Sequence, residues 1–185
     1  PRLVSSAASD VYKRQTLPLS LQFLTLALLL IPVSLLMGKF GRKKIFILGV
    51  LSSLLGTLIV AFSIFDKNFM YFIVGSIFIG VSQATQQFYR YAAADNVPDN
   101  FKSKALSYVL AGGLIAAILG PELSKISYTF LTEYIYLATY LIAGTVQILN
   151  LFVLAFLNIP KPKKNINVKR PLSEILLKKE LILAI

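Results

Sequence analysis

The chain has 185 residues, of which 56% are hydrophobic and 15% are charged, whereas about 25% are charged in an ordinary soluble domain. This composition indicates a membrane protein. The sequence contains no cysteine and no histidine. It therefore cannot form a disulfide framework, a Cys/His zinc site or a catalytic Ser–His–Asp or Cys–His group.

Residues 1–15 are polar and lack the apolar core of a signal peptide. They resemble a translated sequencing adapter, in which case the native protein is longer at this end. The alternative is a disordered cytoplasmic tail. Under both interpretations residues 1–15 are set apart from the fold.

Uncharged stretches long enough to cross a membrane recur along the rest of the chain, since about 20 apolar residues span the hydrocarbon core. Backbone polar groups in lipid must be satisfied within the element, which favours helices. We therefore predict an all-α, polytopic membrane bundle in residues 16–160, followed by a basic loop (161–180) and the start of a sixth span (181–185). The five complete spans are expected near residues 16–37, 45–65, 69–91, 104–123 and 134–158.

Lysine and arginine are distributed unequally between the two sides of this predicted bundle. Beyond the N-terminal segment, nearly all of them lie in or next to loops 38–44, 92–103 and 161–180, and only Lys67 and Lys125 lie on the other side. By the positive-inside rule these three loops are cytoplasmic. The net charge of +11 therefore follows the membrane topology, which argues against nucleic-acid binding.

The sequence GKFGRKK (residues 38–44) joins the first two predicted spans through a very short loop. Gly38 and Gly41 supply the backbone freedom for the turn. The loop resembles the signature between the second and third helices of the major facilitator superfamily, with Gly38 in place of the family's aspartate and Ser34 in place of a glycine. The residues that match its basic places and its remaining glycine are Lys39, Gly41, Arg42, Lys43 and Lys44.

The resemblance covers residues 16–185, as helices two to six, the central loop and the start of helix seven. Residues 111–121 resemble the glycine-rich fifth helix with its terminal Gly120-Pro121. The resemblance implies a secondary transporter that moves a small solute by alternating access and whose C-terminal half belongs to the same chain. It also implies that the span near residues 69–91, the family's fourth helix, lines the solute cavity.

Polar residues inside the spans are the candidates for solute contact. Four of them lie at i, i+3, i+4 and i+7 on one stripe of the third span, where amides can donate and accept hydrogen bonds and an arginine adds a fixed positive charge. The alternatives are that the glutamines bond neighbouring helices and that the arginine reaches lipid phosphates. This stripe consists of Gln83, Gln86, Gln87 and Arg90.

Two weaker pairs complete the candidates for solute contact. Gln22 and Thr25 lie in the first span, and Gln147 and Asn150 lie at i, i+3 in the fifth. For the pair in the fifth span, hydrogen bonding between helices is the favoured alternative.

The glycines of the fourth span predict close helix packing, because small residues let backbones approach one another. The resemblance adds a sliding interface during alternating access. The residues concerned are Gly112, Gly113 and Gly120, followed by Pro121.

Arg42 and Asp95 fall on the same cytoplasmic side, so we predict an ion pair between them that acts as a gate. No Asp or Glu lies in the middle of a predicted span, which leaves a coupling proton as an open alternative. The prediction is thus a transporter in a bacterial inner membrane, which is not an enzyme and needs no cofactor or metal. A membrane scaffold or a membrane-embedded enzyme is the alternative from another class.

Overall fold

The computed structural model describes residues 2–128, 130–131, 133–157 and 159. In this part of the chain the secondary structure is helical without strands, which confirms the all-α class. The predicted basic loop (161–180) and sixth span (181–185) lie outside the described residues. The elements are α1 (Arg2–Phe40), α2 (Arg42–Phe65), α3 (Phe69–Gln86), α4 (Tyr89–Asp95), the 3₁₀ turn η1 (Asp99–Phe101), α5 (Lys102–Ser127) and α6 (Leu137–Phe156).

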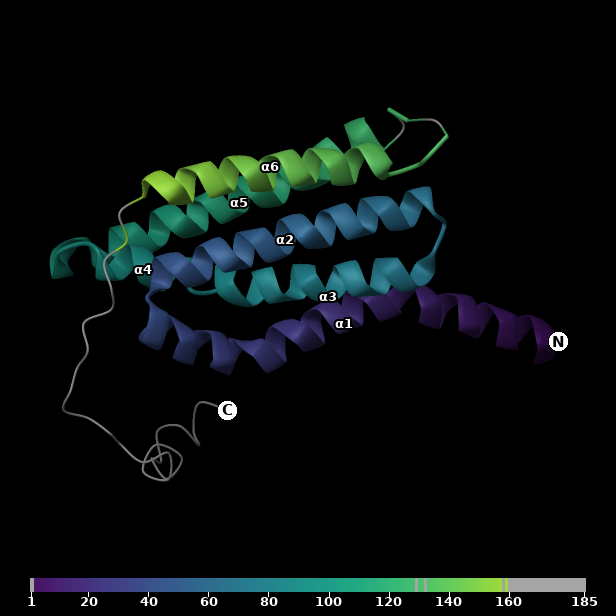
Figure 1. Cartoon of the computed structure of the whole chain (residues 1–185), viewed down its shortest axis with the longest axis horizontal. Helices are drawn as coiled ribbons and strands as arrows, with labels where there is room; N and C mark the ends of the chain where they lie inside the picture. Colours follow the sequence, from purple (N-terminus) through teal and green to yellow (C-terminus); the bar gives the residue numbers. More distant parts are fainter. Residues whose placement is uncertain (1, 129, 132, 158, 160–185) are drawn as a thin grey trace, which may run out of the picture.

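The long helices run side by side as a bundle in which α2 lies between α3 and α6 (Figure 1). α3 packs extensively against both α2 and α1, and α2 packs against α6. α5 packs mainly against α4 and only slightly against α6. Five helical stretches in the described residues are long and apolar enough to cross a membrane, with α3 and α4 together forming one of them.

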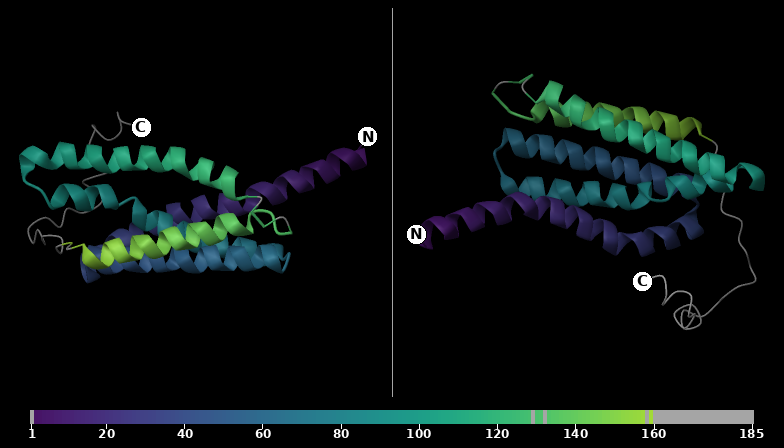
Figure 2. Two further views of the ribbon diagram at one scale, coloured as in Figure 1. Left: turned by 90° about the horizontal axis from the view of Figure 1, so that it is seen from above. Right: turned by 180° about the vertical axis from the view of Figure 1, so that it is seen from behind.

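The first helix begins earlier than predicted. α1 starts at Arg2, whereas residues 1–15 were expected to lie outside the fold, and its apolar part runs from Thr16 to Phe40. Neither glycine nor proline occurs between Arg2 and Leu17, so no residue there interrupts helical hydrogen bonding. The beginning of α1 projects away from the rest of the bundle in both views of Figure 2.

The third predicted span is divided in two. α3 ends at Gln86 and α4 begins at Tyr89, where a single helix over residues 69–91 was expected. At the break the amide of Phe88 donates to the carbonyl of Thr85 (3.1 Å), which is a tighter i→i−3 turn than the α-helix makes. The stripe of polar residues therefore belongs to two helices instead of one.

The turn between α1 and α2 depends on a single glycine. Gly41 has φ 91° and ψ 151°, in a region where a side chain is strained, and its amide donates to the carbonyl of Met37 at 3.0 Å. Gly38 lies inside α1 instead of in the turn, so only one of the two glycines makes the turn.

Close helix packing is concentrated on α3. A Cβ atom built on Gly75 would lie 2.8 Å from the Gly56 carbonyl oxygen of α2, and one on Gly80 would lie 2.6 Å from the Gln22 carbonyl oxygen of α1. The Ser52 hydroxyl adds a hydrogen bond of 2.8 Å to the Phe78 carbonyl between α2 and α3. The packing predicted for α5 is not made in the described part of the chain, where nothing lies within 4 Å of a Cβ placed on Gly112, Gly113 or Gly120.

Candidate functional site

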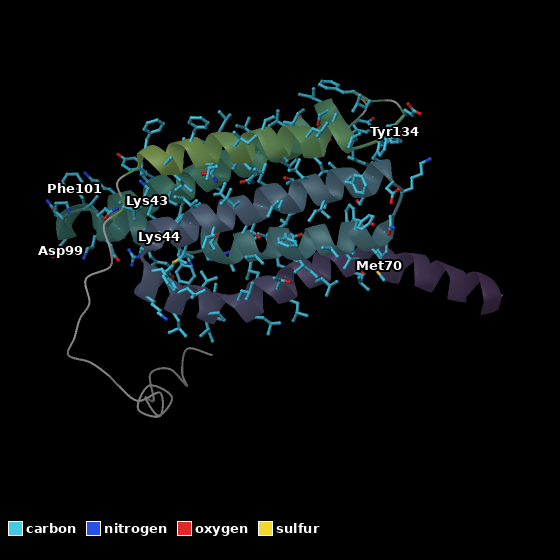
Figure 3. The ribbon with its side chains drawn as sticks, viewed as in Figure 1. Lys43, Lys44, Met70, Asp99, Phe101 and Tyr134 are labelled. Atoms are coloured by element: carbon cyan, nitrogen blue, oxygen red, sulfur yellow. The ribbon has the colours of Figure 1, made fainter. Side chains whose placement is uncertain are left out.

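One end of the bundle carries two of the three predicted cytoplasmic loops, 38–44 and 92–103. Lys43 and Lys44 lie at the same end as Asp99 and Phe101, whereas Met70 and Tyr134 lie at the opposite end (Figure 3). The break between α3 and α4, the turn at Gly41 and the end of α6 also lie toward the lysine-bearing end (Figure 1). The residues predicted to form a gate therefore share one end of the molecule.

The predicted pair of Arg42 and Asp95 is present as an ion pair. The Arg42 Nη2 atom lies 2.5 Å from the Asp95 Oδ2 atom, which connects the first residue of α2 to the last residue of α4. The Arg42 side chain is 17% exposed and that of Asp95 is 53% exposed, so the pair is half in contact with solvent. This arrangement holds α4 against the start of α2.

Lys43 makes a second long-range contact, which was not predicted from the sequence. Its Nζ donates to the carbonyl of Ala155 at 2.8 Å, at the C-terminal end of α6. The last carbonyls of a helix lack partners within the helix and carry partial negative charge, so a lysine suits this place. The two residues are 112 positions apart, and no local pattern in the sequence links them.

The stripe on α3 and α4 is mostly open to its surroundings. Gln86, Gln87 and Arg90 are exposed, and the Gln86 Nε2 atom donates to the Ser82 hydroxyl at 3.2 Å. The Gln83 Oε1 atom is buried without a hydrogen-bond partner among the described residues. Amide groups thus lie along the half of this span nearer the lysine-bearing end.

Arg90 lies on the surface against its neighbour. Its Nη2 atom donates to the Tyr91 hydroxyl at 3.3 Å, and its guanidinium group lies 5.0 Å from the centre of the Tyr91 ring. This exposed arrangement leaves the guanidinium free to meet an anionic group from outside the described residues.

The two weaker pairs have different surroundings. Gln22 and Thr25 lie where α1 approaches α3 at Gly80, and the Thr25 hydroxyl donates to the Leu21 carbonyl of its own helix at 2.8 Å. In α6 the Gln147 Oε1 atom is buried without a partner in the described part of the chain. Asn150 lines a cavity, and none of the other predicted solute contacts is among the described residues around that cavity.

This cavity has a volume of about 270 Å³ and lies between the start of α2, α4, α5 and the end of α6. Three of the residues around it are polar, namely Tyr89, Asn96 and Asn150. None of the described residues around it is charged. Its apolar walls are formed by Phe46, Ala92, Ala93, Val109, Leu154, Leu157 and Ile159.

Tyr89 was not among the predicted candidates, although it is the most distinctive group in the cavity. Its ring meets that of Phe46 edge to face, with centroids 4.7 Å apart and an angle of 89°. Its hydroxyl is buried against the Asn150 side chain. The wall of the cavity is therefore almost entirely apolar.

Comparison with known proteins agrees with the resemblance seen in the signature loop. The family model described as Major Facilitator Superfamily matches residues 12–185. The chain belongs to this superfamily. It is therefore an integral membrane protein, whose described helices make up part of the helical bundle of that superfamily.

A curated relative covers most of the chain. The Riboflavin transporter RfnT of Brucella anthropi is 36% identical over 174 residues, which amount to 92% of this chain and 44% of the relative. The chain thus spans less than half the length of this relative. No solved structure matches the chain.

Proposed function

We propose that this chain forms part of the N-terminal half of a secondary transporter that moves a small solute across the membrane by alternating access. The family match along residues 12–185 carries the proposal. Five apolar helices and the placement of loops 38–44 and 92–103 at one end of the bundle support it, because a transporter must be embedded in the bilayer with a defined orientation. We place the protein in a bacterial inner membrane, with loops 38–44 and 92–103 facing the cytoplasm.

Riboflavin is the first solute to test. The relative named as a riboflavin transporter is 36% identical to this chain. Gln86 and Gln87 are exposed, and their amides can bind the hydrogen-bonding edge of an uncharged heteroaromatic ring system. In this proposal the solute passes along α3, with Arg90 at the inner end of its path.

The ion pair between Arg42 and Asp95 is proposed as part of the cytoplasmic gate. It joins the start of α2 to the end of α4, on the side where solute would leave or enter. Because the Asp95 side chain is 53% exposed, solvent screens the pair and it is weak enough to break during a transport cycle. A coupling proton is not included, because the described spans carry no Asp or Glu near their middle.

Riboflavin uptake tests this function. The full-length protein would be produced in a riboflavin-requiring bacterium without its own uptake system, and entry of labelled riboflavin would be measured. We expect uptake above the empty vector, and lower uptake in Gln86→Ala and Arg90→Ala than in the control Lys104→Ala, whose side chain lies at the exposed start of α5.

Two results would count against the proposal. Absence of uptake for riboflavin and for a panel of other small solutes would favour a scaffold instead of a transporter. Normal uptake in both Gln86→Ala and Arg90→Ala would remove the stripe from the solute path while leaving the transport function in place.

A further inference from the structure

The first turn of α2 carries charge that its own helix does not favour. Arg42, Lys43 and Lys44 are consecutive cations, and no acidic residue lies in this turn. The N-terminus of a helix carries a partial positive charge, so cations placed there are unfavourable within the helix itself. Partners outside α2 can offset this cost, and Arg42 has such a partner in the Asp95 carboxylate of α4.

The last turn of α6 has the opposite need. α6 ends at Phe156, has no basic residue in its last turn and is followed by Leu157 in an extended conformation. In a continuing helix the Ala155 carbonyl would accept a hydrogen bond from the amide four residues later, which lies beyond the end of α6. The end of α6 thus carries partial negative charge that no cation of its own last turn offsets.

The packing of α6 on α2 brings these two helix ends together. The helices are antiparallel, since Lys43 lies beside Ala155 at one end of the pair and the Phe65 ring lies 5.3 Å from the Tyr134 ring at the other. The Lys43 Nζ atom donates to the Ala155 carbonyl at 2.8 Å. One hydrogen bond therefore gives the cation a partner outside α2 and gives the end of α6 the charge that it lacks.

The lysine contact completes an interface that is packed along its length. Leu154 of α6 is 5% exposed and belongs to the same apolar cluster as Phe46 and Val50 of α2. Farther along the two helices, a Cβ atom built on Gly144 of α6 would lie 3.8 Å from the Thr57 Oγ1 atom of α2. Lys43 thus ties down the end of a helix that already rests on α2.

We propose that Lys43 is a positioning residue that joins the end of α6 to the start of α2, so that the two helices move as one body when the Arg42–Asp95 ion pair opens. α4 is the separate element, because it is a helix of 7 residues that follows the break after Gln86. Adjacent residues of one turn then have different roles, with Arg42 in a contact that breaks and Lys43 in one that stays. The opening of the ion pair rests on the proposed function, whereas the attachment of α6 does not.

Amide hydrogen exchange of the full-length protein in lipid nanodiscs tests the attachment. Lys43→Met keeps the apolar stem and removes the charged donor, so exchange over residues 150–157 should become about fivefold faster as the end of α6 loses its cap. Exchange over residues 42–49 should not become faster, because the same substitution removes an unfavourable charge from the start of α2. Faster exchange in both segments would mean general destabilisation and would overturn the assignment.

Two further variants isolate the charge and its place. Lys44→Met, at the exposed neighbouring position, is the matched control and should leave exchange over residues 150–157 unchanged. Lys43→Arg retains a cation with hydrogen-bond donors and should keep exchange there close to that of the unmodified protein.

Distances between spin labels, measured by electron paramagnetic resonance, test the motion as one body. Labels would be attached to cysteines introduced at exposed positions, pairing Leu48 of α2 with Phe152 of α6 or with Tyr91 of α4, after any cysteines elsewhere in the full-length protein are replaced. Asp95→Asn removes the ion pair, and we expect it to broaden the Leu48–Tyr91 distances while the Leu48–Phe152 distances stay narrow. Lys43→Met should broaden the Leu48–Phe152 distances.

Four results would overturn the inference. Unchanged exchange over residues 150–157 in Lys43→Met would show that Lys43 does not hold the end of α6, and equal acceleration in Lys44→Met would show a general effect of charge. Broader Leu48–Phe152 distances in Asp95→Asn alone would show that α6 does not move with α2. Unchanged Leu48–Tyr91 distances in that variant would remove the opening of the ion pair. None of these measurements uses a solute, so failure of riboflavin uptake is a separate result that concerns the proposed function.

Discussion

The helices α3 and α5 are both rich in glycine, but they are packed very differently. Gly75 and Gly80 of α3 are buried against the backbones of two neighbouring helices. In α5 the single buried residue among those described is Ser127, and its glycines face open space. Glycine in a membrane helix therefore permits close packing without determining where the packing occurs.

The difference lies in the partner helix. Gly75 meets Gly56, so two helices without side chains at the contact bring their backbones together. Lipid tails are as apolar as leucine side chains, so the hydrophobic effect does not drive helices together inside a membrane. Van der Waals packing between the two backbones stabilises this contact instead. A glycine opposite lipid or open space gains none of this packing.

The largest effect is expected from overfilling the α2–α3 contact. Gly75→Leu would add a side chain whose Cβ atom alone would lie 2.5 Å from the Val60 Cγ2 atom and 2.8 Å from the Gly56 carbonyl oxygen. Because backbone cannot move aside as a side chain can, we expect destabilisation by about 3 kcal/mol, at the upper end for overpacked sites. The midpoint of thermal unfolding in detergent, followed by size-exclusion chromatography, measures the change.

Gly113→Leu in the same full-length protein is the matched control, because nothing lies within 4 Å of a Cβ at this position. Its unfolding midpoint should stay close to that of the unmodified protein. Equal loss of stability in both variants would show that α5 is packed as tightly as α3 by segments beyond those described, and would end the contrast between the two helices.

The second effect is smaller because only one methyl group is added. Gly80→Ala places its Cβ 2.6 Å from the Gln22 carbonyl oxygen and 2.9 Å from the Thr25 Cβ, so α1 must shift away from α3. We expect a loss of about 1–2 kcal/mol, since overpacking outweighs the better helix propensity of alanine. A cysteine crosslink between α1 and α3 that forms more slowly in the variant would show the shift directly. An unchanged crosslinking rate and midpoint would contradict the close approach.

The helical spans could be predicted from the sequence because they follow from the solvent, since about 20 apolar residues are needed to cross it. The lysine and arginine bias predicts their orientation, and neither prediction depends on which helices touch. The break after Gln86 could not be predicted, because the residues around it still have helical spacing. The helical start of α1 was not predicted, because a criterion based on apolar length does not detect a helix formed by polar residues.

Only part of the candidate site was predictable from the sequence. The stripe from Gln83 to Arg90 was inferred from helical spacing, and the Arg42–Asp95 ion pair from the predicted placement of both residues on one side of the membrane. The cavity unites α2, α4, α5 and α6, so its shape depends on tertiary packing that no periodicity encodes. Tyr89 is one of several aromatic residues in the sequence, and no local pattern predicts that its ring packs on Phe46 or that its hydroxyl is buried against Asn150.

A third prediction concerns the Arg42–Asp95 ion pair, which joins α2 to α4. α4 is the helix against which α5 mainly packs. A double-mutant cycle with Arg42→Gln and Asp95→Asn should give a coupling energy of about 1 kcal/mol, at the top of the range for surface pairs, because Arg42 is largely buried and Asp95 is not. Added salt should reduce the coupling. The matched pair Glu122 and Lys125, which lies exposed within α5, should give less. A coupling of zero for Arg42 and Asp95 would mean that α4 is held by the Phe46–Tyr89 contact instead.

The smallest predicted change has the opposite sign and tests α5 directly. Gly112 lies inside a helix with open space where its Cβ would stand, so Gly112→Ala meets no atom of the described chain. Alanine loses less conformational freedom than glycine on entering a helix, and the variant should therefore be more stable by about 0.5 kcal/mol. The same substitution at Gly80 is expected to be destabilising, so the two alanine variants differ in sign if the contrast between α3 and α5 holds in the whole protein. If Gly112→Ala instead lowers the unfolding midpoint, another helix lies against this face of α5, and its glycines serve the close packing that their spacing predicts.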